Sequence, residues 1–442
     1  MIYKSYMLYN FRSIPQIQNL PNDLIEAIEI VGSVLPFKTN NYVIENLIDW
    51  ENVPNDPIFT LTFPRKDMLR KHHYEKIKKI VKSGASKSEI KVVADEIRRE
   101  LNPHPAGQLD HNVPQMDGEK IFGMQHKYRE TVLFFPVQGQ TCHAYCTFCF
   151  RWPQFVGMAE LKFASQQAEH LVEYISKNET VTDVLFTGGD PLIMKTKILE
   201  AYIHPLLKSK VKNLQHIRIG TKALAYWPFR FLTDDDAEDL LKLFVDVKNA
   251  GIHLAFMAHF NHPVELKHSA VKEAIEKILR TGTVIRTQSP VLKHINDSPL
   301  VWAEMLKKQV KLGCVPYYMF VARNTGADHY FSIPLVDVWK LFRESYQLVS
   351  GICRTVRGPS MSCLPGKMQI LGVNEIGSEK VFTLRFIQGR HPDWVAKSFF
   401  AKFDDRATWY TDLKPAFGEE KFFFTDELNH ILNPKEVEED LE

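Results

Sequence analysis

The chain of 442 residues is long enough for one large domain with flanking elements, and hydrophobic residues make up 45% of it. Its formal net charge of +2 excludes the strongly basic surface of a protein that binds nucleic acid or an acidic membrane. It contains no apolar run of the roughly 18–20 residues that a membrane span needs, and its N-terminal segment lacks the apolar core of a signal peptide. We therefore expect a soluble, cytoplasmic protein with no nucleic-acid or membrane partner.

Residues 1–120 are expected to form a mostly helical N-terminal region. Ser86 and Glu89 have the spacing of a capping box, which satisfies free backbone N–H groups at the start of a helix. The helix predicted after them has one apolar face, made of Ile90, Val93, Ala94, Ile97 and Leu101. The proline-rich segment LNPHPAGQLDHNVP, at 101–114, then predicts an irregular crossing.

A repeating pattern of strand and helix begins near residue 131. Six short apolar runs lie at 131–137, 181–187, 216–220, 252–258, 283–288 and 315–320. Amphipathic helical patterns separate them, and Gly251 and Gly313 stand at positions typical of helix ends. Six strand-then-helix units imply a parallel sheet with right-handed crossovers. They favour an α/β fold with a partial (β/α)6 barrel over a closed eight-stranded barrel.

This pattern divides the chain into three expected parts. A helical N-terminal region spans 1–120, the partial barrel spans 121–351, and a mixed C-terminal extension spans 352–442, where the repeat stops. In barrels of this kind the chemistry lies where strands end and loops begin. Unusual polar residues do follow the six predicted strands, as TCHAYCTFC, GGDP, GTK, HFNHP, QSP and ARNTG.

Three of the six cysteines, Cys142, Cys146 and Cys149, follow the first predicted strand. Cysteine thiolates are the usual ligands of a 4Fe–4S cluster, and three of them can each hold a different iron. The fourth iron would then be open to chelate the amino and carboxylate groups of S-adenosylmethionine. An electron from the cluster could break the sulfonium C–S bond of that molecule. The spacing therefore predicts a cluster that generates a radical.

A structural zinc site and buried core cysteines are the alternatives for this loop. A structural zinc ion takes four ligands, often from two C-x2-C pairs. The other cysteines, Cys314, Cys353 and Cys363, are scattered far along the chain, and His143 is directly adjacent to Cys142. This arrangement favours the cluster over zinc.

The loop after the second predicted strand begins with Gly188, Gly189 and Asp190. Two glycines allow the backbone to approach a ligand closely, and the aspartate can accept hydrogen bonds from an ammonium group. The alternative is a tight turn capped by Asp190.

The cysteine spacing resembles the signature of the radical S-adenosylmethionine superfamily. Further strings, from about residue 55 to about residue 330, resemble the lysine 2,3-aminomutase family within it. They are NPHP (102–105), YRETVL (128–133), RIGTK (218–222), AHFNHP (258–263), RTQSPVL (286–292) and PYYMF (316–320). The resemblance implies a 5′-deoxyadenosyl radical that removes hydrogen from a small amino-acid-like carboxylate substrate. It also implies an electron donor such as flavodoxin or ferredoxin.

The resemblance assigns further roles by position. The GGDP turn would hold the methionyl amine of S-adenosylmethionine, Gln288 would contact the same molecule, and His259 would lie near that pocket. Arg151 matches an arginine that pairs with a substrate carboxylate, a task that suits a planar guanidinium. The alternatives are a core histidine at 259 and a surface or helix-capping arginine at 151.

Pyridoxal phosphate, which the family also uses, is less well supported by these residues. Thr131 stands where the family has an arginine for the cofactor phosphate. The four glycines that precede the Schiff-base lysine of the family are missing, which leaves Lys367 as the nearest candidate and Lys380 as a weaker one. The alternative for Lys367 is an exposed lysine at a strand edge. Binding of pyridoxal phosphate therefore stays open.

Arg323 stands where the family has an aspartate for the distal amine of lysine. A positive side chain would repel that amine and favour an acidic or neutral group. The leading prediction is therefore a radical S-adenosylmethionine enzyme whose small carboxylate substrate is not lysine. The alternatives are a pyridoxal phosphate-dependent 2,3-aminomutase with a divergent cofactor site, and a zinc- or cluster-bearing structural protein. The sequence leaves the oligomeric state, including a homo-oligomer, open.

Overall fold

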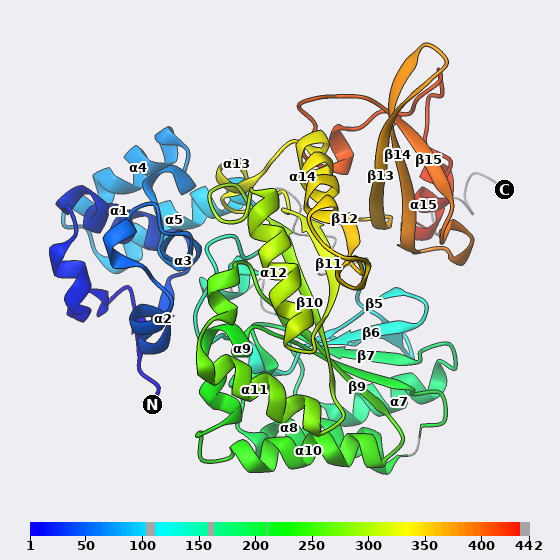
Figure 1. Cartoon of the computed structure of the whole chain (residues 1–442), viewed down its shortest axis with the longest axis horizontal. Helices are drawn as coiled ribbons and strands as arrows, with labels where there is room; N and C mark the ends of the chain where they lie inside the picture. The colour runs from blue at the N-terminus through cyan, green and yellow to red at the C-terminus, as the bar shows by residue number, and fades with distance from the viewer. Residues whose placement is uncertain (103–110, 158–162, 210, 434–442) are drawn as a thin grey trace.

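The computed structural model of the chain describes residues 1–102, 111–157, 163–209 and 211–433. Most of the proline-rich segment, with the NPHP string, lies outside these residues. The described residues form a long sheet covered by helices. In Figure 1 the N-terminal helices lie at the left, and the C-terminal strands, which belong to the same sheet, lie at the upper right. None of the described helices is both long and apolar enough to cross a membrane.

The six predicted strands are present and form the parallel centre of the sheet. Each one is hydrogen-bonded to the next along the chain, in the order expected for right-handed strand-helix units. They are β6 (Thr131–Phe134), β7 (Asp183–Phe186), β8 (His216–Thr221), β9 (His253–His259), β10 (Val284–Val291) and β11 (Val315–Val321). The α/β fold with a partial barrel is therefore confirmed.

The sheet extends beyond these strands at both edges, which the sequence did not predict. β5 (Met124–Tyr128) pairs antiparallel with β6, and β12 (Arg357–Ser362) pairs parallel with β11. Antiparallel strands then follow at the C-terminal edge, namely β13 (Gly366–Ile376), β14 (Glu379–Gly389) and β15 (Ser398–Lys402). The sheet thus runs through the boundary expected after residue 351, and the division into three domains stays a prediction.

Amphipathic helices lie between the strands, as the sequence predicts, and turn their apolar residues toward the sheet. They are α7 (Ala168–Lys177), α8 (Thr196–Lys208), α10 (Ala237–Asn249), α11 (Ser269–Arg280), α12 (Pro299–Lys311) and α14 (Leu335–Gln347). Gly251 and Gly313 follow α10 and α12 with φ angles of 80° and 82°, the left-handed conformation that glycine adopts most easily at a helix end. Two shorter helices also lie in this region, α9 (Ala223–Tyr226) and α13 (Asp328–Phe331).

The N-terminal region is mostly helical, as expected. Its helices are α1 (Asn22–Gly32), α2 (Asn41–Asn46), α3 (Pro57–Thr62), α4 (Lys71–Lys82) and α5 (Lys87–Leu101). The predicted capping box opens α5, because the Glu89 carboxylate accepts from the N–H of Ser86 at 2.8 Å and the Ser86 hydroxyl accepts from the N–H of Glu89. Two small antiparallel two-stranded sheets complete the region, β1 (Ser5–Met7) with β2 (Lys38–Asn40) and β3 (Gln115–Met116) with β4 (Glu119–Lys120). At the other end of the chain lies α15 (Thr425–Leu432).

One face of the parallel strands packs against the helices, and the other is turned away from them. Thr287 of β10 donates to the side chain of Gln309 on α12 at 2.8 Å, so it faces the helices. Because side chains alternate along a strand, Gln288 faces the opposite, concave side. In the register of the sheet it lies beside His259 of β9. Gln288 and His259 therefore share the face of the sheet that is turned away from the helices.

Candidate active site

The three cysteines lie in one loop, which leaves β6 through the short helix η5 (Val137–Gly139). The loop turns where the N–H of Cys149 donates to the carbonyl of Cys146 at 3.1 Å. All three thiols are free and half-buried. Burial raises the pKa of each thiol, to about 12 for Cys146 and well above the usual range for Cys142. The thiols are therefore neutral on their own, and a bound metal would displace their protons.

The N-terminal region holds this loop by hydrogen bonds to its backbone. The N–H of Tyr145 donates to the carbonyl of Lys38 at 2.8 Å, and that of Thr147 donates to the carbonyl of Leu61 at 2.9 Å. The hydroxyl of Thr147 also donates to the carbonyl of Thr60 at 2.8 Å. Because backbone carbonyl acceptors have no sequence signature, the role of these residues in positioning the cysteines could not be predicted.

The GGDP turn packs directly on the base of the cysteine loop. A Cβ added to Gly189 would lie under 3.0 Å from the backbone of Thr141, and one added to Gly188 would meet the side chain of Gln140. The N–H of Asp190 donates to the carbonyl of Thr141 at 2.7 Å. The two glycines are therefore needed for the close approach of two strand exits, whatever ligand they also face.

The carboxylate of Asp190 is buried and accepts hydrogen bonds from three groups of the protein. The donors are the N–H of Leu192 at 3.0 Å, the hydroxyl of Thr221 at 2.8 Å and the N–H of Lys222 at 2.8 Å. Burial raises the pKa of Asp190, and these hydrogen bonds oppose that rise. The side chain thus ties the exit of β7 to the exit of β8. Its contact with a methionyl amine stays a prediction.

His259 and Gln288 lie side by side on the concave face, near the cysteine loop. The ring of Phe148, from that loop, lies 5.7 Å from the ring of His259 between centroids. Burial, together with the nearby charge of Lys222, lowers the pKa of His259 well below its usual value. His259 is therefore a neutral imidazole, which can donate or accept one hydrogen bond at each nitrogen.

Arg151 and Arg323 approach each other across the ring of Phe150. Their Cζ atoms lie 5.1 and 4.9 Å from its centroid, and Arg151 also lies 4.4 Å from the ring centroid of Phe135. Burial lowers the pKa of both, to about 10 for Arg151. Among the described residues neither guanidinium has a carboxylate partner. Buried cations without a counter-charge are costly, so this arrangement favours an anionic ligand.

Lys367 is not an exposed strand-edge lysine. Its Nζ lies 4.1 Å from the ring centroid of Tyr318 and donates to the side chain of Gln388 at 3.1 Å. Burial, together with the positive charges of Arg218 and Arg357, lowers the pKa of Lys367 to about 7. The weaker candidate, Lys380, is exposed and stacks on Phe403 outside this cluster.

Lys127 joins this cationic cluster, although nothing in the sequence marked it. It donates to the carbonyl of Cys363, and burial lowers its pKa to about 7. The charges of Arg323, Arg390 and Lys367 lower the pKa of Lys127 as well, so these groups lie near one another. The cluster therefore connects the predicted substrate residue Arg323 with the predicted cofactor residue Lys367.

Thr131 occupies the position where an arginine was expected for a cofactor phosphate. Its hydroxyl donates to the carboxylate of Asp183 at 2.8 Å, and Asp183 forms an ion pair with Arg218 of β8. A guanidinium is thus present two strands further along, on β8, but it is held by the carboxylate of Asp183 on β7.

Relatives at the sequence level place this site in a family. A protein of Aquifex aeolicus, named "Putative L-lysine 2,3-aminomutase", is 31% identical over 396 residues, which cover 90% of this chain and 92% of that protein. The chain belongs to the lysine 2,3-aminomutase-like family of radical S-adenosylmethionine enzymes. L-lysine 2,3-aminomutase of Bacillus subtilis is 27% identical over 318 residues, which cover 72% of this chain and 57% of that protein. Glutamate 2,3-aminomutase of Clostridioides difficile is 29% identical over 197 residues, 44% of this chain and 43% of that protein.

Comparisons of this aminomutase-like chain with family models and with solved structures give less information about it. No family model matches it. A structure of anSMEcpe with bound AdoMet and a Cp18Cys peptide is 14% identical with a TM-score of 0.38, over 51% of this chain and 63% of that one. A radical SAM methyltransferase from Sphaerobacter thermophilus is 12% identical with a TM-score of 0.37, over 66% and 93%. These scores are too low to bear on the fold.

The cysteine loop suits the 4Fe–4S cluster that the aminomutase-like family implies better than it suits zinc. Two sulfurs bound to one zinc ion lie at most about 4.6 Å apart, because each bond is about 2.3 Å long. Cys142, Cys146 and Cys149 are all described, and their sulfurs do not all lie within 4.8 Å of one another. Ligands of three different irons have no need to be so close. The three thiols therefore suit the irons of a cluster better than a single zinc ion, and their ligation of the cluster stays a prediction.

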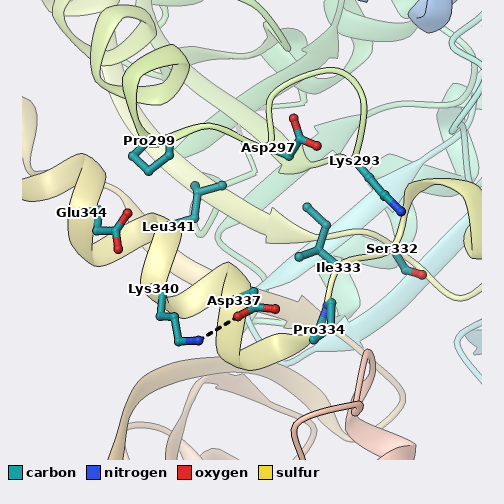
Figure 2. Close-up of a pocket in the computed structure, with 10 residues that line it drawn as sticks. All are labelled: Lys293, Asp297, Pro299, Ser332, Ile333, Pro334, Asp337, Lys340, Leu341 and Glu344. Carbon is teal, nitrogen blue, oxygen red and sulfur yellow. Dashed lines mark hydrogen bonds and ion pairs between the residues drawn. The ribbon is translucent and has the colours of Figure 1, made fainter.

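A separate hollow lies outside the barrel. It has a volume of about 440 Å³ and is lined by residues between β10 and α12 and by the start of α14 (Figure 2). Lys293, Asp297, Asp337 and Glu344 give it mixed charge, and Lys340 pairs with Asp337 across one side of it. It contains no predicted site residue, so it is not the candidate active site.

Proposed function

We propose that this aminomutase-like enzyme binds its cluster through Cys142, Cys146 and Cys149 and acts on a small amino-acid-like carboxylate substrate other than lysine. The observation that carries the substrate proposal is the pair of half-buried guanidiniums, Arg151 and Arg323, which share the ring of Phe150 and have no carboxylate partner among the described residues. One of them comes from the cysteine loop itself, so an anion bound there would lie close to the cluster.

When bound, the cluster and S-adenosylmethionine supply a 5′-deoxyadenosyl radical that can remove hydrogen from an unactivated carbon. The residues of the chain hold and orient the reactants around that chemistry. The concave residues His259 and Gln288 would contact S-adenosylmethionine, and the GGDP turn would receive its amine. An electron donor such as flavodoxin or ferredoxin would reduce the cluster, and the expected place of these reactions is the cytoplasm.

Charge explains why lysine is a poor fit for this site. The distal ammonium of lysine would meet Arg323 and Lys127, and no described carboxylate is available to offset them. Two like charges 4 Å apart repel by about 4 kcal/mol at an effective dielectric constant of 20. A carboxylate or an uncharged group in the same place would avoid that cost. We therefore infer an acidic or neutral substrate side chain.

A second candidate function, a pyridoxal phosphate-dependent 2,3-aminomutase, is favoured by Lys367. A Schiff base forms from a neutral amine, and burial provides one here near pH 7. The cations near Lys367, Arg218 and Arg357, could bind the phosphate of the cofactor, and Tyr318 could pack against its pyridine ring. Thr131 in place of an arginine is the feature that weighs against this candidate.

The test measures formation of 5′-deoxyadenosine by anaerobically reconstituted enzyme with reductant and S-adenosylmethionine. Glutamate, glutamine and lysine are compared, with and without pyridoxal phosphate. We expect lysine to be the poorest of the three, and Arg323→Asp to reduce the response to glutamate at least about tenfold while improving the response to lysine. Arg343→Asp, at an exposed position on α14, is the matched control. A wild-type enzyme that prefers lysine would contradict the substrate proposal.

A further inference from the structure

Among the described residues, one of the three cysteine sulfurs contacts a side-chain hydroxyl. This sulfur belongs to Cys146. The Oη atom of Tyr226 lies 3.3 Å from its Sγ. Tyr226 ends the short helix α9, directly after β8, and is 1% exposed. Either atom could donate while the cysteine is a thiol. A thiolate bound to iron has no proton, so the phenol must then be the donor.

Several contacts fix the phenol in this position. The Nζ of Lys222 lies 4.5 Å from the centroid of the Tyr226 ring, and the N–H of Tyr226 donates to the carbonyl of Lys222 at 2.9 Å. On the other side, the carbonyl of Tyr226 accepts from the buried side chain of Asn40 at 3.0 Å. Both the ring and its backbone are therefore held before any cluster binds.

Lys222 is itself held by a buried network. Its Nζ donates to the carboxylate of Glu265 at 2.6 Å, to the side chain of Asn261 at 2.9 Å and to the carbonyl of His259 at 3.3 Å. Glu265 is fully buried and also accepts from the N–H of His262 at 3.0 Å. The ammonium therefore cannot swing away from the Tyr226 ring without breaking an ion pair, which keeps the hydroxyl aimed at the sulfur.

We propose that Tyr226 is a positioning residue that hydrogen-bonds to the cluster through Cys146 and raises its reduction potential. Reduction adds negative charge to the cluster and to its sulfurs. A hydrogen bond to a sulfur stabilises the reduced form more than the oxidised form, and such bonds are among the determinants of cluster potential. The proposal rests on ligation of the cluster by Cys146, which belongs to the proposed function.

The test compares wild-type enzyme with Tyr226→Phe after anaerobic reconstitution, without added substrate. Iron and sulfide content, the midpoint potential and the electron paramagnetic resonance spectrum of the reduced cluster are measured. We expect unchanged iron content, a more negative midpoint potential and a smaller fraction reduced by dithionite in the variant. Tyr42→Phe is the matched control, because Tyr42 is fully buried and its hydroxyl has no hydrogen-bond partner among the described residues.

A second measurement uses only the wild-type enzyme, in case Tyr226→Phe does not fold. In D2O, the phenol deuteron should give a deuterium coupling in the pulsed resonance spectrum of the reduced cluster, and resonance Raman should show a shifted Fe–S(Cys) stretch. Equal potentials in Tyr226→Phe and wild-type enzyme with full iron content, or no such coupling, would overturn the inference. A wild-type protein that takes up no iron would instead overturn the proposed function.

Discussion

Burial lowers the pKa of Lys367, an effect that its position in the sequence does not indicate. An ordinary lysine, with a pKa near 10.5, is almost fully charged at neutral pH. Burial, followed by the positive charges of Arg218 and Arg357, disfavours the ammonium form of Lys367, whereas the carboxylate of Asp183 favours it. The resulting pKa of about 7 makes this lysine a nucleophile near neutral pH.

This environment predicts a pH dependence for covalent capture of pyridoxal phosphate. The neutral amine is lost as pH falls through 7, so capture by Lys367 should increase about tenfold between pH 6 and pH 8. The measurement is the mass of the protein after borohydride reduction at each pH. Lys367→Met should abolish the added mass, whereas Lys380→Met, at the exposed lysine, should leave it unchanged. Capture that rises only above pH 9 would show that Lys367 is not the reacting group.

At the scale of elements, the exits of β6 and β7 form one unit that a single methyl group would disrupt. Gly189→Ala places a Cβ against the backbone of Thr141, which cannot rotate away as a side chain could. We expect a loss of about 1–3 kcal/mol in the free energy of unfolding and a markedly lower iron content after reconstitution. Gly351→Ala is the control, because nothing lies within 4 Å of its added Cβ. Normal iron content in Gly189→Ala would show that the turn does not position the cysteine loop.

The order of strands and helices could be predicted from the sequence because each carries its own signal. Apolar runs of strand length, helical amphipathic faces and glycines at helix ends are local patterns, and the six parallel strands follow from them. The edge strands could not be predicted in the same way. Strands β13 and β14, for example, pair with each other as a hairpin across Gly377 and Ser378, outside the repeating strand-helix unit.

The candidate site was predictable in part, for the same reason. The cysteine spacing and the position of the GGDP turn at a strand exit are visible in the sequence. The network around the site is not, since Asp190 is bound by backbone N–H groups and by Thr221 of another strand. Lys127 and Tyr226 were missed because their roles depend on neighbours that lie far away in the sequence.

At the scale of the whole molecule, both the N-terminal region and the barrel hold the cysteine loop in place through hydrogen bonds. The structure places the side chain of Asn40, which is fully buried, between the two parts. It donates to the carbonyl of His143 in the cysteine loop at 3.1 Å and to the carbonyl of Tyr226 at 3.0 Å.

Asn40→Ala tests whether this contact supports the cluster site. The same side chain accepts from the N–H of Val43 and so caps α2, and its loss leaves two buried carbonyls without that donor. We expect the free energy of unfolding to fall by about 2–4 kcal/mol and iron to be lost faster to a chelator. Asn46→Ala removes only a local bond to Tyr42 within α2 and should have a much smaller effect on both. If the two variants lose iron at the same rate, the N-terminal region contributes stability alone, and the cysteine loop keeps its shape through the barrel.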